Sequence, residues 1–315
     1  MSNDDDGGIP LACPRDFSLN MASKFVKDFP AAQGGGDGPT LDLAFPIEGS
    51  WQQVGVRVQQ SVRRLTASIL HNDAAASGPR VQSEVERILN LHTDHLGDLE
   101  GIGRRDPIAG ALIRHFHGLR PVQFHTPYEA AVWAVLSQRV RTGQAATIKR
   151  GIARAFGTRM EFPGGTDLWC FPAPRQLLTL RTFPGLTPRK MHHLHEVAHA
   201  TLDRKLDSAS LLRLPSSEAL SVLESIAGVG PFSAELILVR GAGHPDHFPL
   251  QERRLHQAMQ TLYGITGVGQ LETIAGNWKP LRSWIAFLVR AWQEAGCPEL
   301  ATLPSSASGV VGVRG

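Results

Sequence analysis

The chain has 315 residues, of which 42% are hydrophobic and 19% are charged, and its formal net charge is +3. This composition excludes wholesale disorder, and no apolar run reaches the roughly 18 residues that a membrane-spanning helix needs. The three cysteines, Cys13, Cys170 and Cys297, are too far apart for a disulfide framework or a CxxC metal motif. The acidic N-terminus does not resemble a secretory signal, so we expect a soluble, intracellular, globular protein.

The first 118 residues indicate a leader followed by a small mixed domain. Residues 1–40 are rich in Asp, Gly and Pro, which predicts a mostly disordered leader. Four later segments have regular patterns: 54–58 and 65–69 alternate as strands do, whereas 81–91 and the residues after Asp106-Pro107 have helical spacing. We therefore expect a small α+β domain over 41–118, and it contains no recognisable catalytic motif.

From residue 119 onward the patterns are helical and the charge is basic. Residues 121–315 contain 20 Lys and Arg against 14 Asp and Glu, which suits a polyanionic partner but is also common in ordinary domains. Thr126-Pro127-Tyr128-Glu129 matches a helix capping box. Further helical patterns cover 145–156, 174–180, 188–202, 216–225, 231–240, 252–262 and 279–294. We expect an all-α domain over 119–300 and a loose tail over 301–315.

A glycine-rich turn joins two of these helices and makes a hairpin over 216–240. Gly228-Val229-Gly230 forms a tight turn, and Pro231 begins the next helix at the position that proline favours. The N–H groups at the start of that helix are suited to binding a DNA phosphate. The same glycines nearly match a dinucleotide fingerprint, but that motif requires a preceding strand. A purely structural pair of helices is the other alternative.

Four segments agree in order with one known family: 127–140, 183–190, 226–234 and 278–284, the last reading Trp-Lys-Pro-Leu-Arg-Ser-Trp. Together they resemble the helix-hairpin-helix (HhH-GPD) DNA glycosylase superfamily, and in particular its 3-methyladenine DNA glycosylase II (AlkA-like) branch. The resemblance covers roughly 119–296. It implies a mainly α fold of two helical subdomains after a small α+β domain. It also implies a monofunctional glycosylase of base-excision repair that hydrolyses flipped alkylated purines from double-stranded DNA.

The resemblance implies a catalytic carboxylate in the loop after the second hairpin helix. Alignment from Gly228 places it at Glu252, where the family has aspartate; Asp246 lies too early in the loop. Glutamate retains the charge that stabilises an oxocarbenium-like transition state, but its added methylene changes the reach by about 1.5 Å. One alternative is a solvated glutamate paired to Arg253 or Arg254. Another is a protein that binds damaged DNA, or one that acts on a different lesion.

The resemblance also implies the other site residues. The lysine of the family's lyase branch corresponds to Phe232, so we expect an abasic product and no strand cleavage. Phe232, Trp278 and Leu236 correspond to the base pocket, where ring faces attract positively charged purines. The predicted DNA-contacting residues are Gln138, Arg139, Arg141, Gly228, Gly230 and Phe232, with Lys149 as a further phosphate contact. Arg139 corresponds to the wedge that fills the gap left by the flipped nucleotide, or else is an ordinary exposed arginine.

No cofactor is expected beyond a Na⁺ or K⁺ ion at the hairpin. By resemblance alone, the backbone carbonyls of Glu224, Ile226 and Val229 hold that ion. The four cysteines of the iron–sulfur branch are missing, and the helix face of His192, His195 and His199 lacks the acidic or cysteine ligands of a zinc site. The expected partner is double-stranded DNA with a damaged base, with no membrane association. We expect a monomer in the cytoplasm, associated with the nucleoid in a bacterium.

Overall fold

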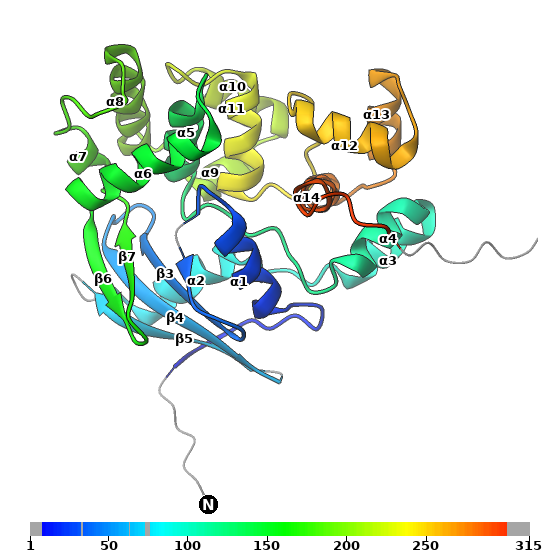
Figure 1. The fold of residues 1–315 in the computed structure, drawn as a ribbon, viewed down its shortest axis with the longest axis horizontal. Helices are drawn as coiled ribbons and strands as arrows, with labels where there is room; N and C mark the ends of the chain where they lie inside the picture. The colour runs from blue at the N-terminus through cyan, green and yellow to red at the C-terminus, as the bar shows by residue number, and fades with distance from the viewer. Residues whose placement is uncertain (1–7, 33, 63, 73–75, 301–315) are drawn as a thin grey trace, which may run out of the picture.

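A five-stranded antiparallel sheet and a larger body of helices make up this computed structural model (Figure 1). It describes residues 8–32, 34–62, 64–72 and 76–300. The sheet has the order β1-β5-β4-β3-β2, with bounds β1 (Ile9–Leu11), β2 (Gly34–Gly35), β3 (Thr40–Pro46), β4 (Gln53–Ser61) and β5 (Arg64–Asn72). The two predicted strands lie within β4 and β5. The mainly α class with a small sheet at the N-terminus is confirmed.

Two helices cover the sheet, α1 (Leu19–Asp28) and α2 (Gly78–Ile88). Val26 of α1 and Val81 of α2 belong to the same apolar cluster as the buried residues of β3 and β4. Ser18 caps α1 by accepting the N–H of Met21, and burial of every third or fourth residue gives the helix its inner face.

The predicted disordered leader is therefore wrong for the described part of 1–40, which contains β1, α1 and β2. The prediction failed because the Gly- and Asp-rich composition of the whole segment outweighed the pattern of one short amphipathic helix. Leu19 and Ala22 of this helix are completely buried against the sheet. Residues 1–7 and the predicted tail, 301–315, lie outside the described residues.

The helical body contains the remaining helices: α3 (Leu96–Arg105), α4 (Pro107–His115), α5 (Pro127–Ser137), α6 (Thr142–Phe156), α7 (Pro174–Leu177), α8 (Pro188–Leu202), α9 (Ser208–Arg213), α10 (Ser216–Glu224), α11 (Pro231–Leu236), its continuation as the π-helix η1 (Ile237–Ala242), α12 (Arg253–Tyr263), α13 (Val268–Gly276) and α14 (Arg282–Glu294). One apolar cluster unites residues of α5, α6, α8, α10 and α11, and a second unites α3, α4, α12, α13 and α14. Because α3 and α4 pack with the C-terminal helices, the expected boundary at 118 does not separate two cores.

A β-hairpin interrupts the helices, so the expectation of an all-α domain over 119–300 is wrong at this point. Strands β6 (Thr158–Phe162) and β7 (Thr166–Cys170) pair antiparallel. Met160, Phe162 and Leu168 cluster with Ala44 of β3, which fixes the hairpin beside the main sheet (Figure 1). The turn between the strands has two glycines at positive φ, which are residues typical of hairpin turns.

Candidate DNA-binding and catalytic site

The glycine-rich turn joins α10 to α11 as predicted, and its two glycines differ in their surroundings. Gly228 has a φ of +90°, and a Cβ there would lie 2.5 Å from Cγ of His193 on α8. Glycine is therefore required by both backbone angle and space. Gly230, the N-cap of α11, has an ordinary φ of −98°, and nothing lies within 4 Å of a Cβ built on it. Its lack of a side chain leaves the start of α11 open.

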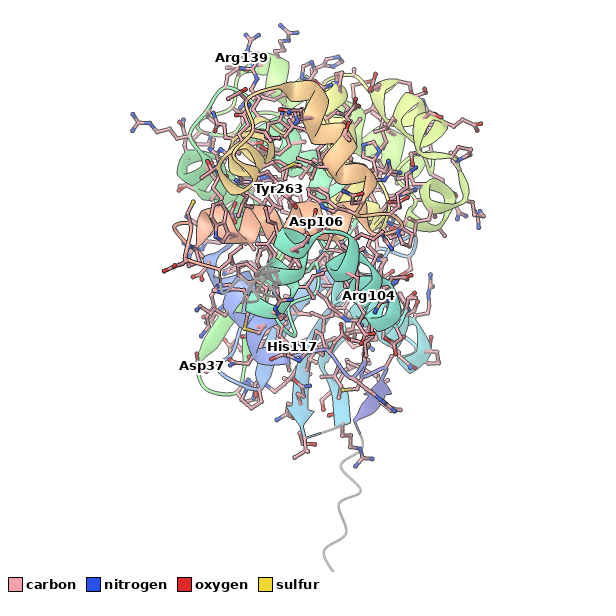
Figure 2. All side chains as sticks on the ribbon, turned by 90° about the vertical axis from the view of Figure 1, so that its right-hand side faces the viewer. Asp37, Arg104, Asp106, His117, Arg139 and Tyr263 are labelled. Atoms are coloured by element: carbon pink, nitrogen blue, oxygen red, sulfur yellow. The ribbon has the colours of Figure 1, made fainter. Side chains whose placement is uncertain are left out.

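The turn after α5 lies against the hairpin. Gln138 Nε2 donates to the carbonyl oxygen of Gly228 at 2.8 Å, so two segments predicted to contact DNA are adjacent in the fold. Arg139 follows with a φ of +55°, in a region that costs a non-glycine residue about 1–2 kcal/mol. Its side chain is exposed and extends from the top of the molecule in Figure 2. Arg141, the exposed N-cap of α6, is close in sequence.

Lys149 is not on this surface. It is 1% exposed, and its Nζ donates to Glu129 and to the carbonyl oxygen of Ala31. The predicted phosphate contact is therefore wrong, because the ammonium group is used inside the protein. The pairing also changes the capping box: Thr126 accepts the N–H of Glu129, but the Glu129 carboxylate contacts Lys149 and His125 instead of completing the box.

A loop connects the hairpin to the predicted catalytic position, and Glu235 of α11 holds it in place. The Glu235 carboxylate is buried, and its two oxygens accept the N–H groups of Leu250 at 2.9 Å and of Gln251 at 2.8 Å. At the other end of the loop, Arg282 Nε donates to Asp246 Oδ1 at 2.7 Å. The loop is thus attached to both α11 and α14.

Glu252 is half-buried and is the N-cap of α12. Its Oε1 accepts the N–H of Arg254 at 3.0 Å, and the hydrogen bonds described for this carboxylate involve that oxygen alone. The alternative of a helix-terminal glutamate paired to Arg253 or Arg254 therefore fits in part, because Glu252 is bonded to Arg254 through the backbone N–H of that residue. Folding the carboxylate back onto its own helix also shortens the reach of the longer side chain.

Three apolar side chains, two on α11 and one in the loop, are at least partly exposed. Phe232, at the start of α11, is 42% exposed, and Leu250, two residues before Glu252, is 39% exposed. Leu236 is half-buried, one turn after Phe232 on the same helix face. Leu250 and Glu235 were missed from the sequence, because only the folded loop brings residue 250 to α11. Periodicity does not show that Leu250 is exposed or that its backbone meets the Glu235 carboxylate.

Trp278 occupies a different environment from that expected of a base-pocket residue. It is completely buried, and its Nε1 donates to Asp106 Oδ2 at 2.9 Å. The rings of Phe248 and Tyr263 pack against it. Figure 2 shows Asp106 and Tyr263 side by side in the middle of the molecule. Protein atoms therefore cover the indole, and the structure places Trp278 in the core of the second cluster.

The remaining predictions concern metals and membranes. In the hairpin turn the Ile226 carbonyl accepts the N–H of Val229 at 2.9 Å. This bond uses one of the two lone pairs of the oxygen and leaves the other available to a second partner. Within the described ranges no group of three or more His, Cys, Asp or Glu side chains is arranged to hold a metal. His195 Nε2 instead lies 2.8 Å from the carbonyl oxygen of Leu180. None of the helices over 8–300 that the structure describes is long and apolar enough to span a membrane.

Comparison with known proteins finds relatives whose names point to the same kind of protein. No family model matches the sequence. The chain is 25% identical over 193 residues to the DNA-3-methyladenine glycosylase of Bacillus subtilis (strain 168), a match covering 59% of this chain and 63% of that protein. It is 30% identical over 202 residues to a probable bifunctional transcriptional activator/DNA repair enzyme AlkA of Mycobacterium tuberculosis, a match covering 63% of this chain and 40% of that protein. The chain thus matches less than two thirds of the length of these relatives.

Solved structures show the same architecture. The 3-methyladenine DNA-glycosylase from Archaeoglobus fulgidus superposes with a TM-score of 0.73 at 20% identity, covering 90% of this chain and 97% of that chain. The Clostridium acetobutylicum 8-oxoguanine glycosylase/lyase in complex with dsDNA gives 0.61 at 16% identity, covering 89% and 93%. The chain therefore has the fold of these DNA glycosylase structures. In sequence it is similar to proteins named DNA-3-methyladenine glycosylase and AlkA.

Proposed function

We propose that this protein is a monofunctional DNA glycosylase of base-excision repair that removes flipped, alkylated purines such as 3-methyladenine. The observation that supports it most directly is the attachment of the Glu252 loop to α11 through Glu235. A strand bound by its phosphates at the start of α11 would lie beside a carboxylate. The names of the sequence relatives point to the same activity.

In the proposed reaction, the bond between the sugar carbon C1′ and the base nitrogen breaks, and the base leaves with the bonding electron pair. That pair neutralises the positive charge of the alkylated ring. The Glu252 carboxylate stabilises the charge that develops on the sugar. Water adds to C1′ and loses a proton, which leaves an abasic site and an intact strand. Phe232 offers no amine for a Schiff base, so no strand cleavage is expected.

The exposed groups around the loop suit the other tasks of such an enzyme. Phe232 and Leu250 offer apolar surface to the flipped base, with Leu236 behind them. Arg139 is assigned the wedge role, and its exposed guanidinium is able to stack on the unpaired bases. Arg141, Gln138 and the turn from Gly228 to Gly230 are assigned to the strand backbone.

The proposal includes the expected accessory features. The carbonyls of Glu224, Ile226 and Val229 are assigned to a Na⁺ or K⁺ ion between hairpin and phosphate, and no iron–sulfur cluster is required. The protein would act as a monomer on double-stranded DNA that contains a damaged base, in the compartment that holds the chromosome.

A second function has specific observations in its favour. Glu252 caps its own helix, and Trp278 is buried in the core, so two residues assigned by resemblance have structural roles here. A helix-hairpin-helix protein that binds damaged DNA without excising a base would fit both facts. A glycosylase for a different lesion is the third alternative, since the pocket depends on side chains from several segments.

One assay separates these functions. Purified protein is incubated with DNA treated with a methylating agent, and released bases are measured by chromatography. We expect release of 3-methyladenine that falls at least about a hundredfold in Glu252→Gln. Glu272→Gln, which makes the same charge change on the exposed surface of α13, should behave as the wild type. Tight lesion binding without release would identify a binding protein, and release from other lesion-bearing duplexes would identify a different substrate.

A further inference from the structure

Glu235 is an unusual residue for the inner side of a helix. It is 6% exposed, and both of its carboxylate oxygens accept N–H groups from one loop. Burying a carboxylate is unfavourable unless its oxygens are satisfied, and bonds from N–H groups to a charged acceptor are roughly twice as strong as neutral ones. The nearest basic group, His247 Nε2, lies 3.5 Å from Oε1. Main-chain N–H groups therefore form the closest contacts of this carboxylate.

The two N–H groups belong to Leu250 and Gln251, the residues that directly precede Glu252. Both side chains are exposed, so apolar packing contributes little to holding this stretch. Before it, Phe248 is buried in the second cluster, and after it α12 begins at Arg253. The hydrogen bonds described for these two N–H groups both end on Glu235. The position of the loop at 250–251 is thus set from α11.

Glu235 lies on α11, the second helix of the hairpin. Phe232 and Glu235 are three residues apart on α11, and so share one face of the helix. The same helix therefore presents the open N-terminus at Gly230, an exposed aromatic ring and the carboxylate that holds the loop. A shift of the loop relative to α11 would move the Glu252 carboxylate relative to any DNA held at the hairpin.

We propose that Glu235 is a positioning residue for catalysis: it fixes the backbone at 250–251 and thereby sets the place of the Glu252 carboxylate relative to the hairpin. This inference rests on the proposed glycosylase function. The reach of glutamate exceeds that of aspartate, so its carboxylate requires a backbone position matched to the longer side chain. A displacement of about 1 Å at a reacting group can lower a rate on the order of a hundredfold.

The test compares Glu235→Gln with wild type in single-turnover base release and in DNA binding. The variant keeps the size of the side chain but replaces one accepting oxygen with an N–H₂ group that faces a backbone donor. We expect a ten- to hundredfold lower rate constant for release from the bound complex, with a Kd for the same DNA within about threefold. Glu235→Asp, which retains the charge, should lose less, and Glu272→Gln serves as the charge-matched control.

Hydrogen exchange gives a readout that does not depend on activity. The amides of Leu250 and Gln251 should be protected in the wild type and exchange at least about tenfold faster in Glu235→Gln, while the amides of α5 and α8 remain unchanged. If Glu235→Gln is too unstable to purify, Glu235→Asp is measured in the same way.

Several outcomes would overturn the proposal: unchanged exchange at 250–251, an unchanged release rate constant, or a Kd that weakens as much as the rate falls. The last result would mean that Glu235 only stabilises the fold. If the wild type releases no base from any duplex, the glycosylase function fails and the catalytic role of Glu235 fails with it. Faster exchange in the variant would then show separately that Glu235 still holds the loop.

Discussion

The indole N–H of Trp278 donates to Oδ2 of Asp106 at 2.9 Å, which joins the segment before α14 to the start of α4. The same oxygen accepts the hydroxyl of Tyr263 at 2.8 Å, and Oδ1 accepts the N–H groups of Ile108 and Ala109. Burial and the Asp106 charge raise the pKa of Tyr263 well above its usual value, so this hydroxyl remains a donor. One carboxylate thus accepts four hydrogen bonds in the second apolar cluster.

Replacing Asp106 should destabilise this cluster without altering the site directly. Asp106→Ala removes a helix N-cap and leaves the Trp278 and Tyr263 donors unpaired, so we expect a loss of roughly 3 kcal/mol in the free energy of unfolding. Urea denaturation followed by tryptophan fluorescence measures it. Glu100→Ala, at an exposed position on α3, should change stability by less than about 0.5 kcal/mol. A comparable loss in both variants would contradict the role given to Asp106.

Lys149→Met should lower stability and leave DNA binding unchanged. The substitution leaves the buried Glu129 carboxylate without its ammonium partner, and breaking a buried ion pair costs roughly 3–5 kcal/mol. Thermal unfolding gives the loss in stability, and fluorescence anisotropy gives the Kd for duplex DNA. Arg150→Met, its exposed neighbour on α6, is the control for loss of one positive charge. A weaker Kd for Lys149→Met alone would restore the phosphate contact predicted from the sequence.

The Glu129 carboxylate should make stability depend on acid pH. Burial raises its pKa, but the attraction of Lys149 and His125 outweighs burial and holds the pKa far below its usual range. A carboxyl whose pKa is lower in the folded state stabilises the fold above its unfolded pKa, near 4.3, and loses this contribution as the pH falls further. The free energy of unfolding should therefore fall less steeply between pH 5 and 3 in Glu129→Gln than in the wild type. Equal slopes would show that Glu129 is not responsible.

Arg139 should contribute to DNA binding at a small cost in stability. Its positive φ means that Arg139→Gly relieves backbone strain, and we expect unfolding to require about 1 kcal/mol more. Both Arg139→Gly and Arg139→Ala should weaken binding to a lesion-containing duplex and reduce the slope of log K against log salt by about 1. Binding titrations at several salt concentrations measure this change. An unaltered salt slope would mark Arg139 as an exposed arginine without a role at the strand.

The two hairpin glycines should respond differently to alanine. Gly228→Ala places a Cβ 2.5 Å from His193 and forces a residue with a side chain into positive φ, so we expect a loss of at least about 2 kcal/mol. Gly230→Ala has room and an ordinary φ, so stability should change by less than about 1 kcal/mol. Its methyl group would nevertheless cover the start of α11 and weaken DNA binding. Intact binding by Gly230→Ala would argue against a phosphate at this N-terminus.

The sequence by itself determined the glycine-rich hairpin, strands β4 and β5 and most of the helices, although it missed β1, α1, β2, β6 and β7. Glycine at a turn and proline at the next helix start restrict the backbone through their own covalent structure, so the hairpin at 228–231 was predictable from adjacent residues. Alternation at 54–58 and 65–69 likewise predicted strands. The loop that contains Glu252 was identified in a different way, by the resemblance to the glycosylase family aligned from Gly228.

Only the tertiary structure decided which side chains meet and which are buried. Lys149 and Trp278 look like functional residues in the sequence, but partners from residues 31, 106 and 129 place them in the core. In the sequence, Glu235 does not differ from other helical glutamates, because its contacts with Leu250 and Gln251 exist only in the folded structure. Burial and hydrogen-bond satisfaction depend on segments distant in the chain, and for that reason the local pattern could not distinguish a catalytic surface from a packed interior.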